Sequence, residues 1–263
     1  MAPFVVTPED ETMITPGARV FGLGIIALAL VCLAFGDFDS GQSMPGDFPG
    51  RTALAYTAAL FMLCAGAALE WRRTVTWGAA ALAVYFALVV VVLMDGRVVV
   101  ANYSEYGTYS SVAAQVAIAA GALMVYAANA RIDASAAARL TRLAQVLFGI
   151  CAVLFGGAHF FYMNLTAPLV PGWLPPSGEF WGYATGIAHI AAGLAILTGV
   201  QARLAAILLT IMYASFTPLV HLPMAVANPS SHFVWSENAL NIILAGVAWV
   251  VADSLVQSGQ RRT

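Results

Sequence analysis

The sequence contains no lysine, and only 9% of its 263 residues are charged. Without lysine the chain cannot form a Schiff base, which excludes retinal proteins and pyridoxal enzymes. The net charge of −2 provides no basic surface for nucleic acid, so no nucleic-acid partner is expected. A soluble domain carries about 25% charged residues. This chain, with 61% hydrophobic residues, must instead be solvated largely by lipid, and the bilayer is its first predicted partner.

Cysteine motifs and a signal peptide are also missing. No CxxC pair occurs, and the three cysteines fall inside apolar runs, at Cys32, Cys64 and Cys151. Buried cysteine behaves as a small hydrophobe, so a dithiol relay within the chain is not expected. The N-terminal segment, residues 1–17, carries three acidic residues and no basic n-region, which argues against a cleaved signal peptide.

Long apolar runs dominate the rest of the sequence. A bilayer-spanning helix takes about 20 predominantly apolar residues. Eight runs reach that length, at residues 18–36, 52–70, 74–94, 111–130, 143–163, 180–199, 203–222 and 237–256. Lipid cannot satisfy open backbone groups, and the runs are too long for barrel strands. The sequence therefore predicts an all-α membrane protein with eight transmembrane helices.

The arginines predict how these helices are oriented. With a cytoplasmic N-terminus, nine of them fall on the cytoplasmic side and two on the other, at Arg51 and Arg97. The nine are Arg19, Arg72, Arg73, Arg131, Arg139, Arg142, Arg203, Arg261 and Arg262. This asymmetry follows the positive-inside rule. We expect a multi-pass protein of a bacterial-type inner membrane, with both termini cytoplasmic and the long polar loops 37–51, 95–110 and 164–179 outside.

The two halves of the chain look related. "YTAALFMLCAGAAL" in the second span matches "YATGIAHIAAGLAI" in the sixth, and "CLAFGDF" matches "VLFGGAHF". We therefore predict two four-helix bundles related by a parallel internal repeat. The units are 18–130 and 143–256, joined by a cytoplasmic connector at 131–142 and flanked by cytoplasmic segments 1–17 and 257–263. All four histidines lie in the second unit, so any chemistry is expected there, with the first unit as a support or partner surface.

The second half carries a family resemblance. The segments "TAPLVPGWLPP" and "FWGYATGIAHIAAGLAILTGVQARLAAILLTIMY" resemble the DoxX family of small four-helix membrane proteins, over about residues 140–255. The first half fits this family only through the internal repeat. The resemblance implies a four-helix unit, a membrane location and an association with redox enzymes. Relatives include a small subunit of thiosulfate:quinone oxidoreductase, and distant ones resemble receptor chaperones. The resemblance supplies no catalytic motif.

Polar residues at helical spacing predict a site in this second unit. Residues three or four apart share a helix face. His189 shares its face with three glycines, which either leave room for a ligand or allow close helix packing. The seventh span carries Tyr213 and His221, the eighth Glu237 and Asn241. His221 could instead cap its own helix.

Further candidates come from neighbouring helix ends. His159 and Tyr162 close the fifth span, and Tyr183 lies one turn into the sixth. A glutamate at membrane depth needs a partner, and histidines are the available ones. We therefore predict an outward-facing His/Glu pocket. His232 is expected to be a solvated loop residue.

Three functions could use such a pocket. The first is binding of a quinone or similar small molecule in a redox-linked role. There His189 or His221 would donate to a carbonyl, Glu237 would relay protons, and a partner redox enzyme would exchange electrons. The second is binding of Cu, Zn or haem by His159, His189, His221 and Glu237, although no metal-ligand spacing occurs. The third is a non-catalytic role in assembling another membrane protein. Whether the protein is an enzyme stays open.

Overall fold

A computed structural model describes residues 14–260, which contain helices and no strands. The order is α1 (Pro16–Phe35), α2 (Arg51–Leu69), α3 (Val75–Val84), α4 (Gly96–Ala101), α5 (Tyr106–Asn129), α6 (Ala134–Phe161), α7 (Met163–Thr166), α8 (Gly178–Thr198), α9 (Ala202–Phe216), α10 (Leu222–Ala227) and α11 (His232–Gln260). π-helical segments join α3 to α4 (Tyr85–Asp95) and α9 to α10 (Thr217–His221), and a 3₁₀ turn (Ala167–Leu169) follows α7.

All eight predicted spans are confirmed as helices long and apolar enough to cross a membrane. The chain is therefore a multi-pass membrane protein. Several boundaries differ from the prediction. The third span runs on to Ala101 and the seventh to Ala227, through their π-helical segments. The connector predicted at 131–142 is helical from Ala134, because the Asp133 side chain accepts hydrogen bonds from Ser135 N and Ala136 N and caps α6.

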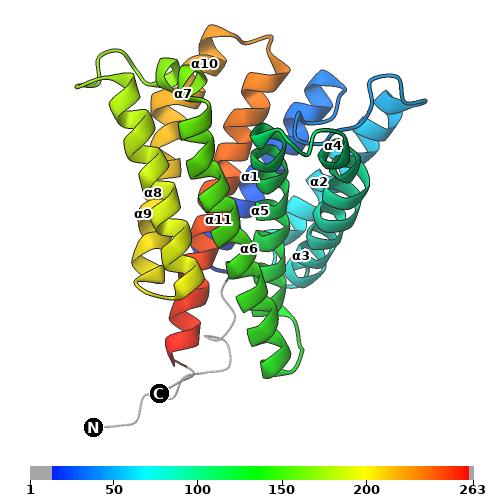
Figure 1. Ribbon diagram of the computed structural model, residues 1–263. Coiled ribbons are helices and arrows are strands. Elements are labelled where there is room, and N and C mark those ends of the chain that lie inside the picture. Colours follow the sequence, from blue (N-terminus) through cyan, green and yellow to red (C-terminus); the bar gives the residue numbers. More distant parts are fainter. Residues whose placement is uncertain (1–13, 261–263) are drawn as a thin grey trace.

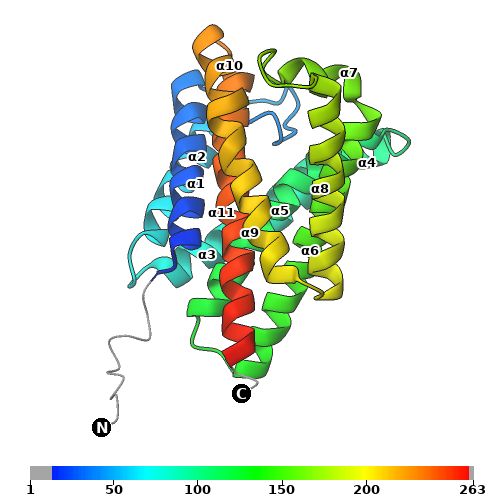
Figure 2. The ribbon, with the colours of Figure 1, turned by 90° about the vertical axis from the view of Figure 1, so that its left-hand side faces the viewer.

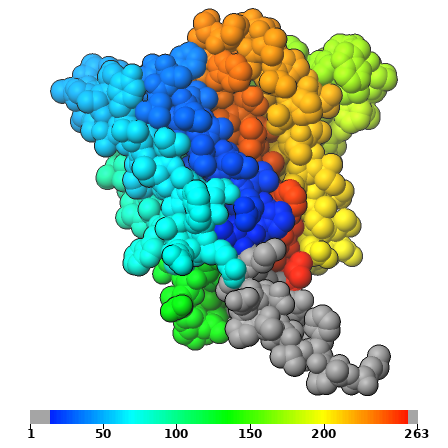
Figure 3. All heavy atoms as spheres, turned by 180° about the vertical axis from the view of Figure 1, so that it is seen from behind, coloured from blue at the N-terminus to red at the C-terminus, as the bar shows by residue number. Residues whose placement is uncertain are grey.

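The helices pack side by side in an order that crosses the predicted boundary between units. α1 packs against α2 and α11, whereas α5 packs against α3, α6 and α11. Figure 2 shows α1, α11 and α9 next to one another, and Figure 3 shows α1 (blue) running between the cyan α2–α3 region and the orange-to-red α11. The two predicted bundles are thus not self-contained, since the first helix of each unit contacts the last helix of the other.

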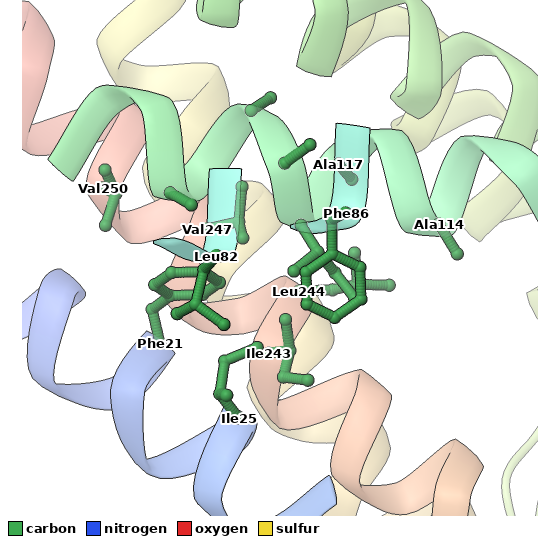
Figure 4. Close-up of a cluster of buried hydrophobic side chains, with 14 of the residues drawn as sticks. Phe21, Ile25, Leu82, Phe86, Ala114, Ala117, Ile243, Leu244, Val247 and Val250 are labelled. Carbon is green, nitrogen blue, oxygen red and sulfur yellow. The ribbon is translucent and has the colours of Figure 1, made fainter. Parts of the chain in front are cut away.

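Glycines allow the closest of these crossings. A Cβ added at Gly24 of α1 would lie 2.7 Å from a side-chain carbon of Ile243, and the α11 residue Gly246 lies directly against the backbone of Phe21. The surrounding core is apolar and fully buried. Figure 4 shows it where α1, the third span, α5 and α11 meet, with Phe21, Ile25, Leu82, Phe86, Ala114, Ala117, Ile243, Leu244, Val247 and Val250.

Candidate functional site

A cavity of about 850 Å³ lies toward the end of the bundle that carries α7 and α10 (Figure 1). We call it the histidine cavity, after His159, His189 and His221 in its wall. Most of its lining is apolar, from α6, α8, α9 and α11. Its volume falls within the roughly 300–1,000 Å³ typical of small-molecule sites.

The structure brings together six of the eight residues predicted to bind a ligand. Those lining the cavity are His159, His189, Tyr213, His221, Glu237 and Asn241. The other two do not line it. The Tyr162 hydroxyl accepts a hydrogen bond from Gly107 N at 2.8 Å, which ties the end of α6 to the start of α5. Tyr183 is 45% exposed and packs on Phe160.

Close packing of α6 on α8 places two of the histidines in contact. A Cβ at Gly156 would lie 2.6 Å from the carbonyl oxygen of Gly186, so these helices can approach this closely only with glycine there. The ring centroids of His159 and His189 are 5.0 Å apart as a result. Glycine packing and a histidine site, which the sequence left as alternatives, therefore occur together.

The hydrogen bonds of these two rings determine what they can offer a ligand. Nδ1 of His159 lies 2.8 Å from the carbonyl oxygen of Phe155, and Nδ1 of His189 lies 2.8 Å from that of Thr185. A carbonyl oxygen only accepts, so Nδ1 carries the proton in each ring. In the neutral ring Nε2 is then an acceptor, pointing away from its own helix. The expectation that His189 donates to a ligand carbonyl is therefore wrong for the neutral ring.

Tyr213 and Asn241 complete this wall of the cavity. The Tyr213 ring lies 5.4 Å from that of His189, and its hydroxyl is buried with no hydrogen-bond partner among residues 14–260. Asn241 Nδ2 donates to the Tyr213 carbonyl and to Thr217 Oγ1, both at 2.8 Å. Pro218 has no N–H to donate within the π-helical segment. The Asn241 amide thus supplies a donor where the helix backbone changes its pattern.

A second group of polar residues reaches the cavity from the first half of the chain. From the sequence, that half was expected to be only a support or partner surface for the second. Gln115 of α5 and Gly41 line the cavity beside Glu237. Asp39 is only 2% exposed, and its Oδ2 accepts from Gly41 N at 3.1 Å. The electrostatic influence of Asp39 reaches Glu237. The site is therefore shared between the two halves.

Buried polar atoms in this second group lack partners. Within residues 14–260, Asp39 Oδ1 and both amide atoms of Gln115 make no hydrogen bond. Gln115 Nε2 occupies the space that a side chain at Gly41 would take. A single glutamine inside the apolar run 111–130 was the signal that could have drawn attention to this residue.

His232 lies outside the cavity lining and is not a solvated loop residue. It begins α11, and its ring stacks on Phe35 with centroids 4.9 Å apart. Its Nε2 is buried without a hydrogen-bond partner in the described chain, and its charge acts on Asp39. The prediction failed because α11 starts five residues earlier than the predicted eighth span, which carries His232 onto the helix.

The geometry does not suit the metal and haem alternatives. Across residues 14–260, no three His, Cys, Asp or Glu side chains are grouped so that they could hold a metal ion. The rings of His159 and His189 are 5.0 Å apart, too close for a haem between them.

The fold and the cavity define a multi-pass membrane protein with an apolar chamber walled by histidines. The model of one protein family, described as a domain of unknown function (DUF8561), matches residues 147–252. The matched region begins within α6 and ends within α11, and it covers less than half of the chain. No curated protein and no solved structure matches the chain. Nothing in these comparisons connects the chain with the DoxX family, so that resemblance stays a prediction.

Proposed function

We propose that the protein binds an amphipathic small molecule of the quinone class in the histidine cavity, preferring its reduced, hydroxyl-bearing form. The observation that carries this proposal is the contacting pair His159 and His189, whose Nδ1 atoms are engaged by backbone carbonyls. Their Nε2 atoms are therefore acceptors, which match the two hydroxyl groups of a hydroquinone better than the carbonyls of a quinone. The apolar wall suits a ring and an isoprenoid tail.

The redox-linked role follows from the chemistry of such a ligand. Oxidation of a hydroquinone to a quinone releases two electrons and two protons. An imidazole Nε2 and the Glu237 carboxylate can take the protons. The chain has no CxxC motif to take the electrons, so a partner redox protein in the membrane is part of the proposal.

Three further proposals concern the architecture. The first is that the halves are a parallel repeat of DoxX-like units. It is supported by the π-helical segment in the third span of each half and by the reciprocal pairing of α1 with α11 and α6 with α5. The second is that α1 begins and α11 ends at the cytoplasmic face, with the cavity toward the outside. The third is that the membrane is a bacterial-type inner membrane. The arginine distribution supports the orientation, and Arg261 and Arg262 lie outside the described residues.

The proposal is tested by binding of a short-tailed hydroquinone and its dimethyl ether, which has the same ring and tail but a methyl group in place of each hydroxyl hydrogen, so it has no hydroxyl donors. The purified protein in mild detergent is titrated anaerobically, with quenching of Trp181 in the cavity wall as the signal. One lost hydrogen bond costs about 1 kcal/mol, so loss of both should weaken binding of the ether roughly thirtyfold.

Variants locate the binding. His189→Phe keeps a ring but removes the acceptor, and it should reduce the preference for the hydroquinone. Tyr213→Phe removes one buried hydroxyl and should weaken binding several-fold, whereas the matched control Tyr183→Phe, outside the cavity, should not. Equal affinity of the wild type for the hydroquinone and the ether would show that the two imidazoles do not accept hydrogen bonds from the ligand's hydroxyl groups, which would contradict the proposal.

A further inference from the structure

A second cavity, of about 790 Å³, lies at the opposite end of the bundle, where α1 begins and α11 ends. Its wall is formed by the start of α1, the turn between α2 and α3, the end of α5 and the last turns of α11. Three arginines line it, at Arg72, Arg73 and Arg131, and we call it the arginine cavity. It shares no lining residue with the histidine cavity.

The charge in this cavity is predominantly positive. Asp253 is the one acidic residue in its lining. Its carboxylate lies against the start of α1, since a Cβ added at Gly17 would be 2.9 Å from its Oδ2, and it is attracted to Arg203. Within residues 14–260, the guanidinium groups of Arg73 and Arg131 take part in no hydrogen bond or ion pair.

The cavity combines this charge with an apolar wall near the ends of the helices that are long and apolar enough to span a membrane. Val75, Val125 and Val250 line it and are buried in the bundle. Trp77, also in its lining, is 78% exposed, as an interfacial tryptophan is expected to be. A small anion would contact only the arginines. A molecule that also carries glycerol and acyl groups would pack against the valines as well.

We propose that the arginine cavity binds the phosphate headgroup of an anionic phospholipid. Arginine matches phosphate through paired N–H donors, and basic pockets between transmembrane helices are a recurrent form of headgroup site. Arg73 and Arg131 hold the phosphate, Trp77 lies at the level of the headgroup, and the apolar wall receives the glycerol end of the acyl chains. Such a lipid links α3, α5 and α11 at this end of the bundle.

Native mass spectrometry of the delipidated full-length protein tests this proposal. Phosphatidylglycerol should bind at least about tenfold more tightly than phosphatidylcholine, given the attraction of each arginine near a membrane surface. Arg73→Gln/Arg131→Gln should abolish this preference, and Arg73→Lys/Arg131→Lys should retain most of it. The matched control is Arg139→Gln, in an exposed arginine that bonds Ser135 Oγ and does not line the cavity.

Several outcomes would overturn the proposal. Equal affinity of the wild type for the two lipids is one, and it does not depend on any variant folding. A preference for phosphatidylglycerol that survives in Arg73→Gln/Arg131→Gln is another, since the lipid would then bind elsewhere. A third is inorganic phosphate competing with phosphatidylglycerol at similar concentrations, which would identify a site for free anions.

Discussion

At the scale of single residues, the notable groups are polar side chains held in a low-dielectric interior. Asp39 lies in the loop after α1, within the stretch 37–51 predicted to be a polar loop, yet it is buried. Burial raises the pKa of Asp39 above its ordinary value of 3.8. The N–H groups of Gly41 and Ser40 and the charge of His232 act in the opposite direction.

This raised pKa predicts how stability depends on pH. The folded state binds the Asp39 proton more tightly than the unfolded chain, so its contribution to stability is present at low pH and is lost as pH rises above about 3.8 toward the raised folded pKa. Asp39→Asn, which stays neutral, should flatten the fall in unfolding temperature that occurs as pH rises above about 4. The control Asp47→Asn, an exposed acid in the same loop, should leave the slope unchanged. Identical slopes for all three proteins would show that Asp39 is charged in the folded state.

At the scale of elements, the π-helical segments set how the third and seventh spans end. Thr217–His221 begins with Thr217 and Pro218, and α10 continues directly from it. In a π-helical turn the backbone hydrogen bonds join residues five apart instead of four, so carbonyl groups just before the turn lose their regular backbone partners. The Asn241 amide of α11 satisfies the Tyr213 carbonyl at this point. One side chain thus fastens α9 to α11 and fixes the wall of the histidine cavity.

Replacing this side chain should weaken the protein measurably. Asn241→Leu keeps the volume but removes both donated bonds and leaves the buried Tyr213 carbonyl unpaired, so we expect a loss of about 1–2 kcal/mol in the free energy of unfolding. Denaturant titration in detergent micelles measures it. Asn228→Leu removes a bond to the carbonyl of Met224 in an exposed position and should change the stability by less than about 0.5 kcal/mol. Equal effects of the two substitutions would contradict the structural role of Asn241.

At the scale of the whole molecule, the two halves are interlocked. α11 packs between α1 and α9, and α5 packs between α3 and α6, so each half relies on the other to cover its helices. The core in Figure 4 draws side chains from both halves, for example Phe21 and Val247. The histidine cavity is likewise shared, since Gln115 comes from α5.

This interlocking predicts the behaviour of split proteins. Fragments 1–130 and 131–263, cut in the short connector before α6, should each be degraded or aggregate when expressed alone, because each exposes the glycine-lined faces of its crossings. Co-expression should restore a stable complex that co-purifies at one-to-one stoichiometry. Size-exclusion chromatography in detergent is the measurement. A monodisperse, folded fragment 131–263 on its own would show that the second half is an independent unit.

Much of the fold could be predicted from apolar run length alone, and much of the site could not. All eight spans were located, yet Asp95, which the prediction placed in a loop, lies in the π-helical end of the third span. Among candidate residues, His159 and His189 were correctly assigned to neighbouring spans. Tyr162 and Tyr183 lie outside the cavity lining, which could not be predicted because helical spacing leaves open which face of α6 or α8 turns inward. Asp39 and Gln115 were missed because they belong to the other half.

What the sequence by itself determined is that the chain has eight helices long and apolar enough to cross a membrane, because hydrocarbon permits only helices for runs this long and this apolar. Only the tertiary structure decided which helices pack against each other and which polar atoms remain available to bind a ligand. The pairing of α1 with α11 depends on glycine contacts between residues far apart in the chain. The acceptor character of His159 and His189 depends on hydrogen bonds to their own helix carbonyls. Composition and periodicity contain neither fact, because both arise from where backbones come to lie in space.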